Sequence, residues 1–91
     1  MKILEYYALI KDFTEGAVSV EYFVSYYTTS MKSEIDIKLD RRVFSVLEDL
    51  FEDIDAYSPS VLPENETPLH ISEKTLRDEA RKALQELQNF I

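Results

Sequence analysis

Apolar residues recur along the chain at spacings of three and four, which is the pattern of an amphipathic α-helix. Four separate segments show it, and we predict helices over residues 2–15, 19–32, 41–57 and 73–90. The residues expected on the buried faces, helix by helix, are Ile3, Tyr6, Tyr7, Ile10 and Phe13; Val20, Phe23, Val24, Tyr27 and Met31; Val43, Phe44, Leu47, Leu50, Phe51 and Ile54; and Leu76, Ala80, Ala83, Leu84, Leu87 and Ile91. The pattern therefore predicts an all-α fold.

Residues that start and stop helices flank these segments. Gly16, the only glycine, follows the first segment as a stop signal. Ser19, Asp40 and Ser72 precede the second, third and fourth segments, where their side-chain oxygens can accept hydrogen bonds from the first helical N–H groups. The first two helices are therefore expected to form a short hairpin.

The two longer connections differ in character. Residues 33–39 alternate apolar and polar positions, but one short strand would have no partner, so we interpret them as a connector. Pro59, Pro63 and Pro68 exclude regular structure up to about residue 70 and predict a rigid, extended loop. With 91 residues, of which 45% are apolar, the chain is expected to form a single domain over residues 1–91.

Charge is distributed very unevenly. The chain has a net charge of −8, and residues 48–66 contain seven acids and no base. The flanking segments 1–39, 40–47 and 67–91 carry −2, +1 and 0. Direct binding to nucleic acid is disfavoured, because phosphates are bound by basic patches. There is no cysteine, no apolar run long enough to cross a membrane and no expected signal peptide, so we predict a cytoplasmic protein that binds no membrane.

Five of the seven acids, which we call the acidic face, occupy the second half of the third predicted helix: Glu48, Asp49, Glu52, Asp53 and Asp55. No Lys or Arg lies three or four positions from any of them. Glu48 with Glu52, and Asp49 with Asp53, are like-charge pairs, each of which destabilises a helix by about 0.2–0.5 kcal/mol. A positive partner would explain the arrangement, although solubility alone needs none.

The fourth predicted helix is a useful contrast. Its charges alternate in sign at a spacing of four, so we expect Lys74 to pair with Asp78, Asp78 with Lys82, and Lys82 with Glu86. It balances its own charge, and reversal of Lys74 and Arg77 is expected to do little to partner binding.

Enzymatic chemistry is disfavoured. The acids lie on the solvent side of a helix rather than in a cleft, and the single histidine, His70, is expected to pack or to cap the fourth helix. Acyl carrier proteins are also small and acidic, but they carry their prosthetic group on a serine in Asp-Ser-Leu, and Ser19, Ser45 and Ser72 all lack that motif. We expect no catalytic residue and no cofactor.

One segment partly matches a calcium-binding loop. Asp53, Asp55 and Glu64 match the first, third and last ligands of an EF-hand. However, Tyr57 stands where the fifth ligand belongs and Ser58 where the turn needs glycine, so we expect no metal.

Six tyrosines offer candidate contacts, because tyrosine is enriched in binding hot spots. Tyr27 is expected in the core. Tyr22 and Tyr26 lie off the apolar stripe, and for them core-edge packing and interface contact both stay open. Tyr57, beside the acidic face, is expected to contact a partner.

Three groups of residues carry a resemblance to a known family. They are Ile10, Phe13, Gly16, Val18, Ser19, Glu21 and Phe23; the continuous run from Leu50 to Tyr57; and Ile71, Ser72, Leu76 and Arg77. In these positions the chain resembles the colicin D-type immunity proteins, which belong to the bacterial self-protective colicin-like immunity proteins.

The resemblance implies an antiparallel four-helix bundle that binds one cognate toxin, 1:1, and neutralises its nuclease domain, often a tRNase. Such toxins are delivered as bacteriocins or by contact-dependent inhibition systems. Glu52, Asp53 and Asp55 match by position, and Glu48 and Asp49 join them on charge. The full predicted toxin-binding set is Glu48, Asp49, Glu52, Asp53, Asp55, Tyr57, Glu64 and Glu66. The alternative is a non-enzymatic acidic helical adaptor for another basic protein.

Overall fold

The computed structural model describes residues 3–33, without the side chain of Ser33, and residues 40–91. Within these residues there are four α-helices and two single 3₁₀ turns: α1 (Ile3–Thr14), α2 (Val20–Ser33), α3 (Arg41–Ala56), η1 (Pro63–Asn65), α4 (Glu73–Leu87) and η2 (Gln88–Phe90). All four predicted helices are confirmed. Apart from the end of α2, the predicted connector at 33–39 lies outside the described residues.

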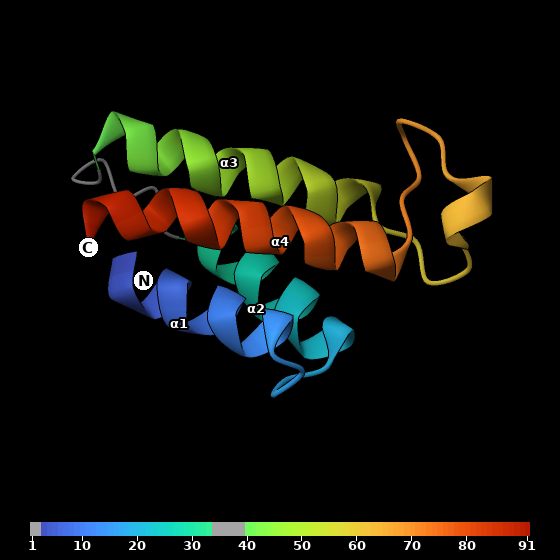
Figure 1. The fold of residues 1–91 in the computed structure, drawn as a ribbon, viewed down its shortest axis with the longest axis horizontal. Helices are drawn as coiled ribbons and strands as arrows, with labels where there is room; N and C mark the ends of the chain where they lie inside the picture. Colours follow the sequence, from blue (N-terminus) through green and yellow to red (C-terminus); the bar gives the residue numbers. More distant parts are fainter. Residues whose placement is uncertain (1–2, 34–39) are drawn as a thin grey trace.

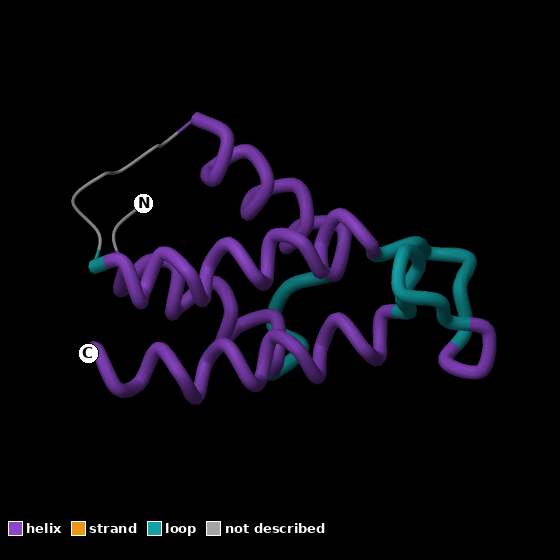
Figure 2. The backbone as a smooth tube through the Cα atoms, turned by 90° about the horizontal axis from the view of Figure 1, so that it is seen from above, coloured by secondary structure: helices purple, strands orange, loops and turns teal. Residues whose placement is uncertain are grey.

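The helices form an antiparallel four-helix bundle. Each packs against two neighbours: α1 contacts α2 and α4, and α3 contacts α2 and α4. In Figure 1, α3 and α4 lie side by side with α1 below them, and successive helices run in opposite directions. In Figure 2, α2, which leads into the grey trace, is inclined to the other helices. The bundle implied by the resemblance is confirmed.

The core is built from the apolar stripes of all four helices. Its buried members are Tyr6, Leu9, Ile10, Phe13, Val20, Phe23, Tyr27, Val43, Leu47, Leu50, Ile54, Leu76, Ala80, Ala83 and Leu87. Leu9 was not expected there. Ile91 was expected to be buried, but the helix gives way to η2 before it and the side chain is 58% exposed. Phe44 is only half-buried.

Local contacts at the helix ends explain why the elements start and stop as predicted. Gly16 has φ of +77°, and the N–H of Ala17 donates to the carbonyl of Asp12 at 2.8 Å, which closes α1 in a Schellman motif. At α2, the N–H of Tyr22 donates to Ser19 Oγ at 3.1 Å. Asp40 caps α3 in the same way by accepting from the N–H of Arg42 at 2.8 Å.

The loop between α3 and α4 is folded rather than extended, so that prediction is wrong. Its two ends are joined, because Ser58 N–H donates to the carbonyl of Ile71 at 3.1 Å and Ile71 N–H donates to that of Ala56 at 2.9 Å. Figure 1 shows the loop projecting beyond the ends of α3 and α4. The prolines prevent a longer helix, but Pro63 starts the single turn η1, where its missing N–H is not needed.

His70 closes a tight turn in this loop, whose tip is formed by Pro68 and Leu69. Its backbone exchanges hydrogen bonds with Thr67 at 3.0 and 3.1 Å, and its side chain is exposed. The expected packing of His70 is therefore wrong.

None of the helices that the structure describes is both long enough and apolar enough to cross a membrane.

Candidate partner-binding surface

The acidic face is the outward side of α3, because the apolar side of the same helix is buried in the core. Val43, Leu47, Leu50 and Ile54 are buried at helical spacing. The carboxylates between them therefore point outward, and four of the five are exposed while Asp53 is half-buried. None of the five forms an ion pair with a base in the part of the chain that the structure describes.

The five acids form two rows. Glu48, Glu52 and Asp55, spaced at i, i+4 and i+7, make an outer row. Asp49 and Asp53 make a second row on the side of α3 that faces α4. The helical period accounts for both rows, but it does not indicate that the second row faces α4.

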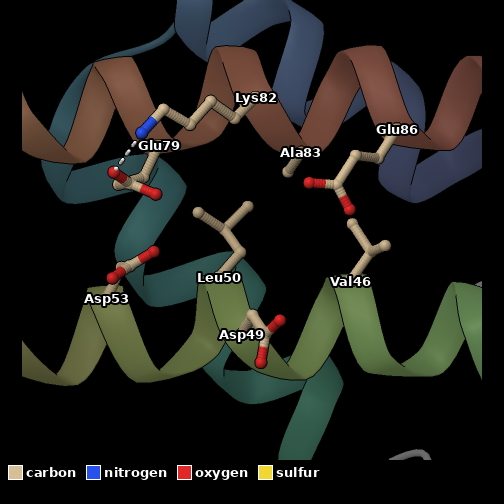
Figure 3. A pocket seen from close by; sticks show the side chains of 8 residues that line it. All are labelled: Val46, Asp49, Leu50, Asp53, Glu79, Lys82, Ala83 and Glu86. Atoms are coloured by element: carbon tan, nitrogen blue, oxygen red, sulfur yellow. Dashed lines mark hydrogen bonds and ion pairs between the residues drawn. The ribbon is translucent and has the colours of Figure 1, made fainter.

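Asp49 and Asp53 line a shallow groove between α3 and α4, which we call the α3–α4 groove. It has a volume of about 100 Å³ and is lined by Val46, Asp49, Leu50 and Asp53 from α3 and by Glu79, Lys82, Ala83 and Glu86 from α4. Figure 3 shows the carboxylates of both helices around this groove. Four carboxylates and one ammonium group thus face one another across two helices, so the negative surface is wider than α3.

The sequence did not indicate that α4 contributes carboxylates to this surface, because the ion pairs predicted for α4 are only partly correct. Asp78 pairs with Lys74 at 3.0 Å, as predicted, but also with Arg81 at 2.9 Å. Lys82 pairs with Glu79 at 3.1 Å rather than with Asp78 or Glu86. Spacings of three and four are equally available on a helix, and sequence alone does not choose between them.

As a result, Glu86 has no ion pair with any base among the described residues, and it adds to the negative charge of the α3–α4 groove.

Asp53 experiences the strongest electrostatic stress of the acidic face. Burial against α4 raises its pKa to about 6, with further contributions from the carboxylates of Glu79, Asp49 and Glu52, while Lys82 lowers it. The ammonium group of Lys82 compensates Asp53 only in part, because that group is engaged by Glu79. This is a carboxylate held in an unfavourable position in the free protein.

The bases of α3 lie at the far end of the helix. Arg42 is bound to Asp40 by two hydrogen bonds of 3.2 Å and lies 4.9 Å from the ring centre of Phe90. The Arg42 guanidinium in turn holds the pKa of the Asp40 carboxyl below its usual range. These contacts attach the start of α3 to the C-terminal turn and leave the acidic face uncompensated.

Tyr57 is not placed with the acidic face. It caps the end of α3, is half-buried and packs against the core. Burial raises the pKa of its hydroxyl, and the charged groups that act on it are Glu73, Glu21 and Arg77, from the starts of α2 and α4.

The two loop acids also differ from each other. Glu64 is exposed in η1. Glu66 points towards the start of α4, where its Oε2 accepts hydrogen bonds from Ser72 N–H at 2.8 Å and from Ser72 Oγ at 3.1 Å. A hydrogen bond from Thr75 and those from Ser72 hold the pKa of Glu66 below its usual range. Glu66 therefore anchors the loop to the start of α4, a role that its sequence position did not indicate.

A family model described as bacterial self-protective colicin-like immunity matches residues 1–87. No curated protein and no solved structure matches the chain.

Proposed function

This chain belongs to the family of bacterial self-protective colicin-like immunity proteins, and we propose that the toxin it neutralises carries a nuclease domain that the acidic face blocks. The observation that carries this proposal is the row of carboxylates on α3 without ion pairs to described bases, extended across the α3–α4 groove by Glu79 and Glu86.

The proposed mechanism is a competition for a cationic groove. A nuclease that cleaves tRNA needs basic side chains to bind phosphates. Glu48, Glu52 and Asp55 would present carboxylates along one helix edge, where Lys and Arg can bind them as they bind phosphates. The polypeptide offers no phosphodiester bond, so the chain would block the groove without being cleaved and without doing chemistry itself.

The geometry of the bundle supports this mechanism in two ways. The acidic face is part of a helix whose other side is buried, so its carboxylates need little ordering on binding, which lowers the entropic cost. In addition, concentrated charge steers the encounter with a basic partner and raises the association rate. Rapid capture matters for an inhibitor, because a free nuclease turns over many substrates.

The arrangement of the side chains supports a contact set that differs from the one expected from the sequence. The outer row and the α3–α4 groove form its centre, and exposed Glu64 lies on the loop beyond it. Tyr57 and Glu66 support the loop and the end of α3, so we propose that they position the surface rather than contact the toxin.

The test uses the cognate toxin, identified as the product of the large gene directly upstream. Its C-terminal domain should co-purify with this chain at 1:1, and tRNA cleavage by that domain should stop when the chain is saturating. Full nuclease activity at saturating chain would overturn the proposal. Co-purification with a basic protein that has no nuclease activity would favour the adaptor alternative.

A matched pair of variants tests the surface itself. Glu52→Lys and Glu15→Lys change the net charge equally at exposed positions, but Glu15 lies in the turn after α1, a helix that packs against α2 and α4. Only Glu52→Lys is expected to restore tRNA cleavage. Equal effects would show that net charge, not the acidic face, governs inhibition.

A further inference from the structure

Two tyrosines of α2, Tyr22 and Tyr26, stack on each other in the open. Their ring centres lie 5.7 Å apart with planes 20° apart, and the residues are 52% and 46% exposed. Tyr6 and Tyr27, by contrast, are buried in the core. Exposed aromatic surface of this size contributes little to folding, so packing does not account for the stacked pair.

The stacked pair forms a ridge between two shallow depressions. One depression, of about 290 Å³, lies between α1 and α2 and is lined by Glu5, Ala8, Leu9, Asp12 and Val18 together with both tyrosines. The other, of about 420 Å³, runs along α2 and is lined by Ser25, Thr29 and Ser30 beside the same rings. We call this region the tyrosine ridge.

The α1 side of the tyrosine ridge is negatively charged. Glu5 and Asp12 lie on the same side of α1 and are both exposed. They are seven residues apart, which corresponds to about 10 Å along a helix. Neither carboxylate pairs with a base in the described part of the chain. Aromatic faces and uncompensated carboxylates are therefore combined on one surface.

We propose that the tyrosine ridge is a second docking surface, which takes an arginine-bearing polypeptide segment. The planar guanidinium group stacks on aromatic rings and binds carboxylates through paired hydrogen bonds, so arginine uses both features of the ridge. The stacked rings are already ordered against each other, which reduces the side-chain entropy lost on binding.

The charge argues against a second copy of this chain as the occupant. A symmetric dimer through the ridge would bring Glu5 and Asp12 of one copy against the same carboxylates of the other, between two chains of net charge −8. Like charges placed together across an interface are strongly unfavourable. A cationic segment relieves the same repulsion.

The tyrosine ridge is separate from the acidic face. It lies on the α1–α2 side of the bundle, whereas the α3–α4 groove lies between the other two helices. A segment docked on the ridge therefore leaves the acidic face open, and the inference does not depend on the toxin-blocking role proposed for α3.

The test uses a short peptide whose charges match the spacing of the two carboxylates. In acetyl-Arg-Gly-Gly-Gly-Arg-amide the arginines are four residues apart, so in an extended chain both side chains lie on the same face, about 13 Å apart, and their long stems can converge on the two carboxylates. NMR titration should shift the ring signals of Tyr22 and Tyr26 and the amides of Glu5 and Asp12 in a saturable way. The neutral peptide with citrulline in place of both arginines should leave these signals unchanged.

Two variants test the two features of the ridge separately. Tyr22→Ser/Tyr26→Ser and Glu5→Gln/Asp12→Asn alter exposed side chains, so both should fold with unchanged circular dichroism. Each should weaken arginine-peptide binding at the ridge by about fivefold or more. Glu48→Gln/Glu52→Gln, on the acidic face, should leave that binding unchanged.

Three results would overturn the proposal. The first is that the arginine peptide shifts only NMR signals of α3. The second is that the citrulline peptide shifts the signals of the tyrosine ridge as much as the arginine peptide does. The third is a concentration-dependent dimer of the unliganded chain that Tyr22→Ser/Tyr26→Ser abolishes in sedimentation velocity, which would assign the ridge to a second copy.

Discussion

α3 and α4 lie side by side, are of similar length and bury similar apolar stripes, yet they treat their charges in opposite ways. α4 pairs its charges internally, through Lys74 with Asp78, Glu73 with Arg77, Asp78 with Arg81, and Glu79 with Lys82. α3 places like charges one turn apart and has no ion pair from its acidic face to a described base. The same bundle therefore accommodates both arrangements.

The difference teaches that the charge pattern of α3 is not required by the fold. A helix in this environment can compensate its charges, as α4 does. The uncompensated acids slightly destabilise α3 and leave a strong negative potential at its surface, which would attract a basic partner. The following predictions test this contrast, from the largest expected effect to the smallest.

The largest effect concerns toxin affinity. Glu48→Lys/Glu52→Lys reverses two charges of the outer row, and we expect the dissociation constant for the cognate toxin to rise about 100-fold, because attraction becomes repulsion. The remaining affinity should depend less on salt. Titration calorimetry at two salt concentrations measures both changes.

The control for this change is Glu15→Lys, which we expect to alter the affinity less than about threefold. Similar losses in the two variants would contradict a localised binding surface.

The next largest effect is expected on stability, from the removal of the Arg77 side chain of α4. Arg77 donates a hydrogen bond to the carbonyl of Phe13, its guanidinium carbon lies 4.3 Å from the ring centre of Phe13, and it pairs with Glu73 at 3.0 Å. Arg77→Met should lower the free energy of unfolding by about 2 kcal/mol in urea titrations.

Arg81→Met is the matched control, because Arg81 is an exposed base of the same helix that pairs only with Asp78 among the described acids. Its effect on stability should lie within the error of the measurement. Equal free energies of unfolding for the two variants would show that the contacts of Arg77 with Phe13 do not stabilise the fold. The expectation from the sequence concerned only partner binding by Lys74 and Arg77, and the contacts of Arg77 with Phe13 add a role in stability.

A smaller effect with an informative sign is expected at Asp53. Its pKa of about 6 in the folded protein exceeds the ordinary value of about 4, so the folded state binds the proton more tightly. Stability should therefore fall as the pH rises from about 4 to about 6 and stay lower above that range. Asp53→Asn removes the charge and should stabilise the protein at pH 7 by about 1 kcal/mol, after allowance for solvent screening.

Asp78→Asn should act in the opposite direction. The hydrogen bond from Lys74 lowers the pKa of Asp78, so the ionised carboxylate stabilises the folded state at pH 7. This stabilisation is lost only as the pH falls into the acid range and the carboxylate is protonated. Thermal unfolding of both variants from pH 4 to pH 8 measures this. Destabilisation by Asp53→Asn at pH 7 would contradict the view that α3 is electrostatically stressed.

The smallest effect is expected from neutralising one member of a like-charge pair. Glu48→Gln removes the repulsion with Glu52 and should raise the free energy of unfolding by about 0.2–0.5 kcal/mol at low salt. Lys74→Gln, which removes an attractive pair of α4, should lower it. The two changes should converge towards zero at high salt, and unfolding in urea at both salt concentrations checks this.

Much of the fold could be predicted because its signals are local. The period of Val43, Leu47, Leu50 and Ile54 defines α3 whatever lies around it. Caps such as Ser72, whose Oγ accepts from Thr75 N–H at 3.3 Å, act within one turn. The burial of Tyr27 was also predictable, although its hydrogen bond to the carbonyl of Leu47 at 2.6 Å was not, because it spans two helices.

The chain by itself therefore determined the four helices, their apolar faces and the concentration of acids on α3, since helical period and capping depend on neighbours in sequence. Tertiary packing decided which acids act together. It placed Glu79 and Glu86 opposite Asp49 and Asp53, buried Asp53 against α4 and turned Glu66 towards Ser72. The physical reason is that rotamers and ion-pair partners of similar energy are selected only by groups brought close from distant parts of the chain.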